Sequence, residues 1–557
     1  MYSLGFSLGH DRGAVLMKDG KVLIGISEER LSRIKHDSPY CKDIPILSIN
    51  YCLSEYNLKY SDIDLYSYTT AYLEDDVLEN FVNVTGLDHT RLKFLPHHLA
   101  HAFSTFYSSG FEDAVVVVAD AMGSILSEKN QTKNWYNLDN LSKDENFDWA
   151  EGYSIFNFTS LSNVQEIYKK LIKFPISEND DSDDQVSIGF AYSRGTKQLV
   201  YDEKSNSWSA GKLMGLASYA DPDYVKNYQS NIKYYDDDMF IPSRLINPEV
   251  NYKSDFSSKA NTAGLYQRNQ EESCIHLSKI AKNNTGAKNL CVAGGSFLNC
   301  NTNELLIKSG MYEKYYFVPP ADDTGIPLGC AWFGTFVQNK IPTVTEQMSP
   351  YFGKTYSDSS ILSSLISFDE ITFEKIYNYD KLVDLVSEDL KNDKVIGWMQ
   401  GGSEIGPRAL GNRSILASPK NSWVVNYINS DIKKREWYRP FAPSVLFEHQ
   451  KDIFDLEEYS PYMLVTTKVK TEWKDKIPAV VHYDGTSRIQ SVTPENNYRY
   501  YNLIHKFYQK TGIPVLLNTS FNGSEPIVET PSDAVRTFLN TGLYSLVIND
   551  FYIRRKQ

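Results

Sequence analysis

The sequence predicts an α/β fold with more than one domain. Short apolar runs such as 114–119 and 395–399 are bounded by polar or Gly-rich turns, as buried strands are, and helix-periodic segments such as 97–107 alternate with them. A chain of 557 residues is also too long for one hydrophobic core. Residues 338–349 contain Pro342 and no periodicity. We therefore place the domain boundary there and expect domains at 1–345 and 346–557.

Composition excludes several classes of partner. The net charge of −13 argues against nucleic acid or an anionic membrane as the partner. The six cysteines are scattered and form no Cys-x-x-Cys pair, which predicts reduced thiols in a cytoplasmic protein. The chain has no apolar run of about 18 residues and no secretory signal, so we expect a cytosolic protein with no membrane span.

The amino end predicts strands joined by tight turns. Residues 4–8, 14–17 and 22–26 are apolar or alternating, Asp19-Gly20 is a hairpin signal, and Gly9-His10-Asp11 forms a polar turn. Strand, Gly-containing polar turn and strand recur at 114–124. This repetition predicts the duplicated halves of an actin-like ATPase (ASKHA) domain, whose turns lie against nucleotide phosphate.

Residues 96–124 predict a metal site. Pro96 suits the start of a helix, and His97 and His101 then lie four residues apart on one helix face. The buried strand 114–119 ends at Asp120, and ligands bind at strand ends in open α/β sheets. Two imidazoles and a carboxylate suit a divalent cation. The alternatives are that these histidines are ordinary core or surface residues, or that His98 and His101 form the pair.

Two later strand ends supply candidate nucleotide-binding residues and a further candidate metal ligand. Gly294-Gly295 follows an apolar strand and precedes a helix that contains Asn299, an arrangement that brings backbone N–H groups close to a phosphate or ribose. Asp323 follows the next strand and would complete a nitrogen and oxygen shell around the metal. Between these regions, residues 125–210 are rich in Asn, Asp and Ser and look like an insertion, with a solvated acidic loop at 180–184.

The carboxyl part carries basic residues in turns. The segments 400–414, 433–444, 484–488 and 517–522 combine Gly, Ser and Asn with Arg or Lys. Guanidinium groups bind phosphate in a bidentate way, so these segments predict a phosphorylated substrate. The alternative is structural ion pairing with Glu404, Glu436 and Asp484.

Taken together, these motifs resemble the O-carbamoyltransferase family of nodulation-factor, cephamycin and aminoglycoside biosynthesis, the NodU/CmcH type. The matching segments occur in order over nearly the whole chain: Gly9-His10-Asp11, 97–102, the strand ending at Asp120, 211–217, Gly294-Gly295 with Asn299, 323–325, 406–413, 435–444 and 518–522. Residues 125–210 match least.

The resemblance implies a fold and a reaction. It implies an actin-like ATPase domain, similar to the tRNA-threonylcarbamoyl transferase subunit, followed by a YrdC-like α/β domain. The YrdC-like domain would make carbamoyl-adenylate from carbamoyl phosphate and ATP with Mg²⁺. The amino domain would then transfer the carbamoyl group to a hydroxyl of a small-molecule or sugar acceptor. A homodimer is compatible with this organisation.

The resemblance also implies roles for individual residues. The metal, iron with manganese or zinc as alternatives, would be held by His97, His101, Asp120 and Asp323. His10 and Lys35 would be catalytic and flank the acceptor and the carbamoyl carbonyl. The segment around Lys35 alone favours the alternative, a solvated lysine near a helix. Carbamoyl phosphate and the adenylate would be bound by Arg408, Lys433, Arg439, Arg488, Asn518 and Ser520.

Three other functions share parts of this pattern. An actin-fold sugar kinase or ATPase would explain the amino half but would leave the basic carboxyl segments without a task. A tRNA threonylcarbamoyl-transferase-like enzyme shares both domain types but would require a basic face. A non-catalytic metal or nucleotide sensor would not need an exposed His10. The mass of the product, with carbamate addition, phosphate addition or neither, distinguishes them.

Overall fold

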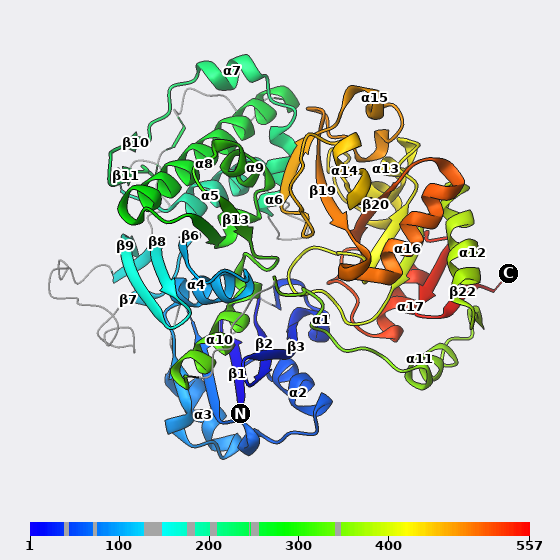
Figure 1. Cartoon of the computed structure of the whole chain (residues 1–557), viewed down its shortest axis with the longest axis horizontal. Coiled ribbons are helices and arrows are strands. Elements are labelled where there is room, and N and C mark those ends of the chain that lie inside the picture. The colour runs from blue at the N-terminus through cyan, green and yellow to red at the C-terminus, as the bar shows by residue number, and fades with distance from the viewer. Residues whose placement is uncertain are drawn as a thin grey trace. The chain divides into compact units, whose positions relative to one another are not determined.

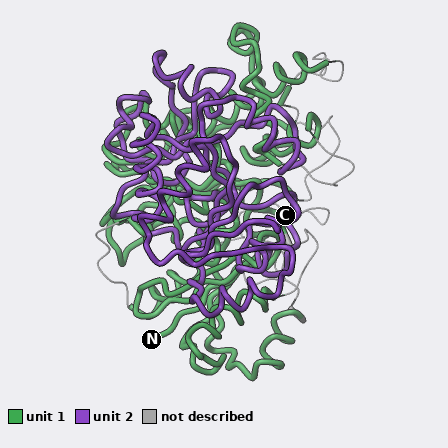
Figure 2. Tube along the Cα trace, turned by 90° about the vertical axis from the view of Figure 1, so that its right-hand side faces the viewer, with its two compact units in different colours: residues 1–28, 36–348 green, residues 29–35, 349–557 purple. Residues whose placement is uncertain are grey.

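The computed structural model describes residues 1–37, 44–70, 75–126, 148–174, 184–200, 209–243, 245–246, 255–339 and 347–556. The chain divides into two compact units (Figure 2). Unit 1 comprises Met1–Glu28 and His36–Met348, and unit 2 comprises Glu29–Lys35 and Ser349–Gln557. Among the described helices, none has the length and apolarity that a membrane crossing requires.

The first sheet of unit 1 has five strands in the order β3-β2-β1-β4-β5. Strand β1 pairs antiparallel with β2 and parallel with β4, β2 pairs antiparallel with β3, and β4 pairs parallel with β5. The predicted hairpin at Asp19-Gly20 therefore forms. The strands are β1 (Tyr2–Ser7), β2 (Gly13–Lys18), β3 (Lys21–Ser27), β4 (Leu65–Thr69) and β5 (Leu92–Phe94).

The second sheet of unit 1 repeats this order and these directions. Strand β6 pairs antiparallel with β8 and parallel with β12, β8 pairs antiparallel with β9, and β12 pairs parallel with β13. The short strand β7 also pairs with β8. The strands are β6 (Ala114–Ala119), β7 (Ile125–Leu126), β8 (Asp148–Ser160), β9 (Asn163–Phe174), β12 (Asn289–Ala293) and β13 (Lys314–Phe317). Two sheets of one topology confirm the predicted duplicated, actin-like fold of the amino part.

The prediction that residues 125–210 are an insertion is wrong in part. The segment is not simply an insertion, because β8 and β9 form the long hairpin that completes the second sheet. Polar residues mislead here because most side chains of β9 are only partly buried, whereas β8 carries the buried face. Most of the predicted acidic loop, 180–183, lies outside the described residues.

Helices cover the sheets of unit 1. Helix α10 (Ile326–Val337) packs on β1 and on α4 (His97–Ser108), and Gly5 and Gly329 leave room for this close approach of backbones. Figure 1 shows α8 (Phe256–Thr285) beside α5 (Ile188–Val200) and α9 (Cys300–Ser309). The remaining elements are α2 (Ile46–Glu55), α3 (Asp75–Thr85), α6 (Ala210–Ala217), α7 (Pro222–Asn227), β10 (Lys233–Tyr234) and β11 (Met239–Phe240).

Unit 2 is built on one nine-stranded sheet in the order β14-β22-β21-β15-β16-β20-β17-β19-β18. The pairs β15–β21 and β17–β19 are parallel and the others are antiparallel. The strands are β14 (Ile371–Lys375), β15 (Ile396–Met399), β16 (Arg413–Ala417), β17 (Ala442–Leu446), β18 (Val465–Lys468), β19 (Thr486–Val492), β20 (Val515–Ser520), β21 (Ser545–Ile548) and β22 (Phe551–Arg555). The carboxyl part is thus the mixed α/β domain that was expected as YrdC-like.

The helices of unit 2 include one from the amino end of the chain. Helix α1 (Glu29–Ser32) belongs to this unit, where Arg30 donates to the carbonyl of Gly406 and Arg33 donates to the carbonyls of Pro526 and Ile527. The others are α11 (Asp358–Leu365), α12 (Tyr379–Lys391), α13 (Trp423–Tyr427), α14 (Phe447–Ile453), α15 (Thr471–Lys474), α16 (Pro494–Thr511) and α17 (Pro531–Asn540).

Candidate functional site

Helix α4 presents two imidazoles on one face. His97 and His101 lie one turn apart, with ring centroids 4.9 Å from each other. His98 turns elsewhere, because its Nδ1 lies 2.9 Å from the hydroxyl of Ser154. Burial lowers the pKa of His98 to about 4, so this imidazole is neutral. The geometry therefore favours the pair His97 and His101 over the alternative pair His98 and His101.

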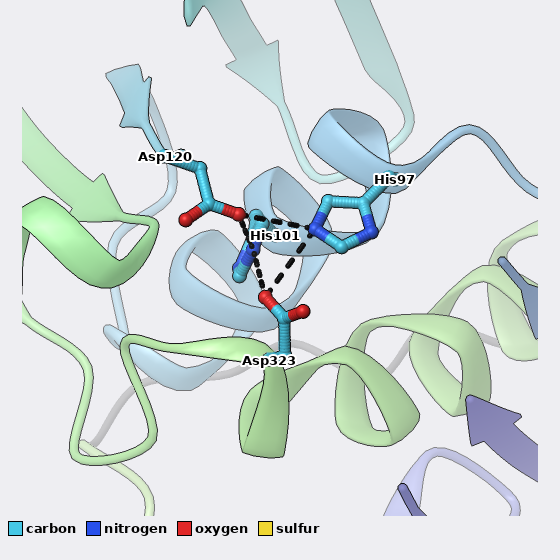
Figure 3. A group of neighbouring side chains, drawn as sticks. All are labelled: His97, His101, Asp120 and Asp323. Atoms are coloured by element: carbon cyan, nitrogen blue, oxygen red, sulfur yellow. Dashed lines mark hydrogen bonds and ion pairs between the residues drawn. The ribbon is translucent and has the colours of Figure 1, made fainter. Parts of the chain in front are cut away.

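Two carboxylates meet these imidazoles (Figure 3). Asp120 follows the last residue of β6, and Asp323 begins the 3-10 turn Asp323–Gly325 that leads into α10. Nε2 of His97 lies 3.2 Å from Oδ2 of Asp120 and 3.4 Å from Oδ1 of Asp323, and the distances from Nε2 of His101 are 3.4 and 3.5 Å. One donor atom of each of the four residues lies within 4.8 Å of all the others. We call these four residues the His-Asp cluster.

The surrounding backbone orients Asp120. Its Oδ1 accepts from the N–H of Ala121 at 2.8 Å and of Gly295 at 3.2 Å, which leaves Oδ2 for the imidazoles. Gly294 has a φ of 95°, and a side chain there would collide with the backbone of Ala119. The glycine pair therefore allows the end of β12 to lie against the end of β6. The N–H groups of both glycines already have partners within the protein. Gly295 donates to Asp120, and Gly294 donates to the carbonyl of Ala321.

The His-Asp cluster has the chemistry of a divalent-metal site. Two imidazole nitrogens and two carboxylate oxygens converge in a buried place, where Nε2 of His101 faces the two carboxylates at 3.4 and 3.5 Å. Burial opposes the charged forms of His97 and Asp120. The charge of Asp323 and the hydrogen bond with Asp120 nevertheless raise the pKa of His97 well above its usual value. The hydrogen bonds with His101 and His97 lower the pKa of Asp120 well below its usual value. The donor set thus fits a metal such as iron, manganese or zinc.

His10 lies at the edge of this cluster. Its Nδ1 is 3.0 Å from Asp11 and its Nε2 is 3.6 Å from Asp323, and its side chain is half exposed. The hydrogen bond with Asp11 and the charge of Asp323 raise the pKa of His10 to about 10. In the protein without a cation, His10 is therefore an imidazolium. Neutralising the charge of these carboxylates, as a bound cation would, lowers the pKa of His10 and favours its neutral form.

Two titratable residues that were not predicted as site residues interact with Asp11, the partner of His10. Nδ1 of His36 lies 2.8 Å from Asp11. Burial and the charge of Asp11 raise the pKa of Asp322 to about 6. Asp11 was visible in the sequence as part of the turn Gly9-His10-Asp11, whereas nothing in the sequence relates His36 to this turn.

Asn299 is used inside unit 1. It caps α9 by accepting from the N–H of Thr302, and it exchanges two hydrogen bonds of 2.9 Å with the amide of Gln267. Tyr192 also donates to Gln267. Asn299 thus organises the region where nucleotide binding was predicted, and its contact with a nucleotide stays a prediction, as do those of Gly294 and Gly295.

Unit 2 contains a second group of charged side chains, in which several cations lie together and Arg439 pairs with Glu436 at 3.7 Å. Burial and then the charges of Arg435 and Lys35 lower the pKa of Lys433 well below its usual value. Burial together with Arg439, Arg488 and Arg408 lowers the pKa of Arg435 to about 9, although Glu436 opposes this change. The members of this cation cluster are Lys35, Arg408, Lys433, Arg435, Arg439 and Arg488.

Lys433 has defined partners. Its ammonium donates to the carbonyl and the hydroxyl of Ser520, at 2.5 and 3.1 Å, and to Oδ1 of Asn522 at 2.6 Å. These partners are neutral, so the positive charge is not balanced by them. Asn518 lies on β20, as Ser520 does, but it does not donate toward Lys433. Its side-chain amide donates to the carbonyl of Ala409, the hydroxyl of Ser444 and the side-chain oxygen of Gln490. Of these two predicted site residues, Ser520 therefore contacts Lys433. The amide N–H groups of Asn518 hydrogen-bond to buried groups of the protein.

An irregular helical turn precedes the basic segment that contains Lys433 and Arg435. Residues Ile428–Ile432 form a π-helical turn, a feature common at functional sites, directly before Lys433. The buried amide of Asn429 accepts from Nε of Arg435 at 2.7 Å and donates to the carbonyls of Trp437 and Arg439. Arg435 also stacks on Phe441. Arg435 lies in one of the basic segments predicted from the sequence, but neither Arg435 nor Asn429 was predicted as a site residue.

Lys35 lies in the part of the chain that belongs to unit 2. Its charge acts on Lys433, which groups it with the other cations of that unit. Its role beside His10 stays a prediction.

Comparison with known proteins covers both units. The family model described as Carbamoyltransferase N-terminus matches residues 3–85 and 66–332, and the one described as Carbamoyltransferase C-terminus matches residues 387–555. Nodulation protein NolNO of Sinorhizobium fredii is 32% identical over 98% of this chain and 79% of its own length. Nodulation protein NolO of Bradyrhizobium diazoefficiens is 32% identical over 83% of this chain and 79% of its own length.

Solved structures show only weak similarity. HypF of T. kodakarensis superposes with a TM-score of 0.35 and 12% identity over 62% of this chain and 49% of that chain. A ROK hexokinase from Thermus thermophilus gives a TM-score of 0.32 and 10% identity over 61% of this chain and 100% of that chain. The fold described above rests on the sheet topology and not on these scores.

Proposed function

Since the chain belongs to the carbamoyltransferase family, and is thus a carbamoyltransferase, we propose that it is an ATP-dependent O-carbamoyltransferase. In this proposal unit 2 makes carbamoyl-adenylate from carbamoyl phosphate and ATP with Mg²⁺, and unit 1 transfers the carbamoyl group to an acceptor hydroxyl. The resemblance to the O-carbamoyltransferase family, to which relatives named nodulation proteins add support, implies a small-molecule or sugar acceptor. The observation that carries the proposal is the pair of chemically different clusters, one of imidazoles and carboxylates in unit 1 and one of cations in unit 2.

The cation cluster of unit 2 supports adenylate formation. Carbamoyl phosphate and ATP are both polyanions, and guanidinium and ammonium groups bind phosphate oxygens through charge-assisted hydrogen bonds. The reaction balances when carbamoyl phosphate and water give carbamate and inorganic phosphate. An oxygen of the carbamate then attacks the α-phosphorus of ATP and displaces pyrophosphate. Arg408, Lys433, Arg435, Arg439 and Arg488 would bind and neutralise these phosphates, with Ser520 beside Lys433.

The His-Asp cluster supports the transfer step. His97, His101, Asp120 and Asp323 would hold a divalent metal, which would supply Lewis-acid polarisation of a substrate oxygen. In the transfer, the acceptor oxygen forms a bond to the carbamoyl carbon, AMP leaves, and the hydroxyl proton must be removed. His10 lies beside Asp323 and is the residue that we assign to receive this proton. The alternative is that His10 contacts a phosphate as an imidazolium.

Product analysis tests the proposal. The protein is incubated with ATP, Mg²⁺, carbamoyl phosphate and a panel of sugar acceptors, and the products are identified by mass spectrometry. We expect AMP, pyrophosphate and an acceptor heavier by one carbamoyl group. ADP together with an acceptor heavier by one phosphoryl group would instead establish a sugar kinase. ATP hydrolysis without any modified acceptor or carbamoyl-adenylate would contradict the carbamoyl-transfer proposal.

A further inference from the structure

We propose that Glu151 is a positioning residue that fixes the amino end of α4, and with it His97, against the strand end that carries Asp120. Glu151 lies in β8, and its carboxylate is fully buried. The inference rests on the proposed metal site in unit 1. It concerns a residue that is not a ligand and that was not singled out in the sequence.

The amino end of α4 has no cap of its own. Its N-cap residue is Pro96, which supplies no side-chain hydrogen bond, although the first N–H groups of a helix need partners. Two groups from elsewhere provide them. The N–H of His97 donates to the hydroxyl of Ser124 at 3.0 Å, and the N–H of His98 donates to Oε2 of Glu151 at 3.2 Å. A carboxylate at this place also interacts favourably with the positive end of the helix dipole.

The same carboxylate binds the loop that follows Asp120. Oε2 of Glu151 accepts from the N–H of Ser124 at 2.9 Å. The backbones pair as well, since Gly123 donates to the carbonyl of Glu151 and Glu151 donates to that of Ser124. A Cβ on Gly123 would lie 2.6 Å from Oε2 of Glu151. One side chain therefore joins the helix carrying His97 and His101 to the segment that begins at Asp120.

Lys169 forms an ion pair with this carboxylate. Its ammonium lies 2.9 Å from Oε1 of Glu151, and only 7% of the Lys169 side chain is exposed. A buried carboxylate without such a partner would take up a proton or be strongly destabilising. Lys169 also pairs with Glu166 at 2.6 Å, and the Glu166 side chain is 42% exposed. The β8–β9 hairpin thus supplies both charges of the pair.

Glu166 provides a matched control for Glu151. Both acids bind the same ammonium, but only Glu151 contacts α4 and the loop after Asp120. Glu151→Gln keeps the size of the side chain and removes its charge, while Lys169 retains Glu166 as a partner. Outer residues that orient metal ligands typically change metal affinity by about 10- to 100-fold. We therefore expect Glu151→Gln to weaken cation binding by this factor and Glu166→Gln to leave it unchanged.

The experiment is a titration of the metal-free full-length protein with Co²⁺, followed by its visible absorption. Folding is checked by circular dichroism, and carbamoyl-phosphate-dependent release of pyrophosphate reports on unit 2. We expect the Glu151→Gln protein to be folded and to release pyrophosphate at the wild-type rate, but to bind Co²⁺ about 10- to 100-fold more weakly than the Glu166→Gln protein. Equal Co²⁺ affinity of the two variants would overturn the inference. Failure of the wild-type protein to bind Co²⁺ would instead reject the metal site itself.

A second variant covers the case in which Glu151→Gln does not fold. Ser124→Ala removes only the hydroxyl that accepts from the N–H of His97. We expect a smaller loss of Co²⁺ affinity, with a changed absorption spectrum because the His97 ring is less well oriented. An affinity and a spectrum identical to those of the wild type would show that the amino end of α4 is fixed without this network, against the inference.

Discussion

The His-Asp cluster of unit 1 and the cation cluster of unit 2 are built on opposite principles. In unit 1, two imidazoles and two carboxylates face one another at 3.2–3.5 Å, so the groups attract and the cluster is assembled by its own members. In unit 2, Lys433 and the arginines repel one another, and burial together with this repulsion lowers the pKa of Lys433 and Arg435. Repelling charges must be held by the surrounding fold, here by Asn429, Ser520 and Asn522.

The difference between the two clusters supports a different proposed ligand for each of them. Lone pairs that converge in a buried place favour a cation. A buried ammonium whose hydrogen-bond partners are neutral, as those of Lys433 are, favours a polyanion. The net charge of −13 conceals this difference, because the basic residues of the second cluster are few and local. A carbamoyltransferase that uses a phosphorylated donor and a metal needs both kinds of site.

The largest effect is expected from removing one ligand of the His-Asp cluster. Structural zinc sites with four protein ligands bind with roughly 10–16 kcal/mol, so by comparison the loss of one of four ligands in His101→Ala should weaken metal binding on the order of 10³-fold. It should also remove most transfer activity. Metal content after dialysis and carbamoyl transfer are the measurements. His98→Asn is the matched control, because His98 lies on the same helix but hydrogen-bonds to Ser154. Full metal occupancy in the His101→Ala protein would reject the cluster as a metal site.

The next effect concerns His10. His10→Asn keeps a similar size and hydrogen-bonding capacity but removes the base, so the transfer rate should fall by about 10²-fold or more. Pyrophosphate release, which we assign to unit 2, should continue at the original rate. Both rates are measured on one preparation. Carbamoylation at nearly the wild-type rate would show that His10 only holds the turn or contacts a phosphate.

A third prediction addresses the cation cluster. Lys433→Ala or Arg439→Ala removes a charge-assisted contact of about 2 kcal/mol, and carbamoyl-phosphate-dependent pyrophosphate release should fall by roughly 30-fold or more. Transfer from carbamoyl-adenylate supplied in solution should be retained. Lys434→Ala is a control on the neighbouring residue. Equal loss of both steps in a folded Lys433→Ala protein would contradict the division of labour between the units.

The smallest effect is a pH dependence. The pKa of Lys433 is lowered in the free protein, and a bound phosphate would favour its charged form. Binding of inorganic phosphate should therefore be accompanied by proton uptake, and the affinity should decrease as the pH rises through the lowered pKa. Calorimetry in buffers of different ionisation enthalpy measures this uptake. Lys433→Met should abolish it, and an unchanged uptake in that variant would assign the proton to another group.

The sequence predicted the parts of the molecule that depend on local pattern. The hairpin at Asp19-Gly20, the strand 114–119 and the helix after Pro96 follow from turn chemistry and hydrophobic periodicity, and all three form. His97, His101, Asp120 and Asp323 were selected from helix spacing and strand ends, and the structure brings them together. Strand topology explains why this works, since parallel neighbours end at one edge of a sheet.

The remaining features depend on long-range contacts. The hairpin of β8 and β9 was read as an insertion because its second strand is largely polar. Glu151 is a single acid in a strand, and its link to α4 and to Lys169 arises only when that strand pairs with β6 and β9. Asn429 and the π-helical turn before Lys433 carry no sequence signal. The inclusion of Glu29–Lys35 in unit 2 is likewise set by contacts with residues such as Gly406.

The most direct test of the two-cluster account is carbamoyl-phosphate-dependent pyrophosphate release, measured side by side in the His101→Ala and Lys433→Ala proteins. It requires no acceptor, so the unknown identity of the hydroxyl compound does not interfere. The account predicts that His101→Ala releases pyrophosphate at the wild-type rate, whereas Lys433→Ala releases it roughly 30-fold more slowly or not at all. Loss of release in the His101→Ala protein, or normal release in the Lys433→Ala protein, would contradict it.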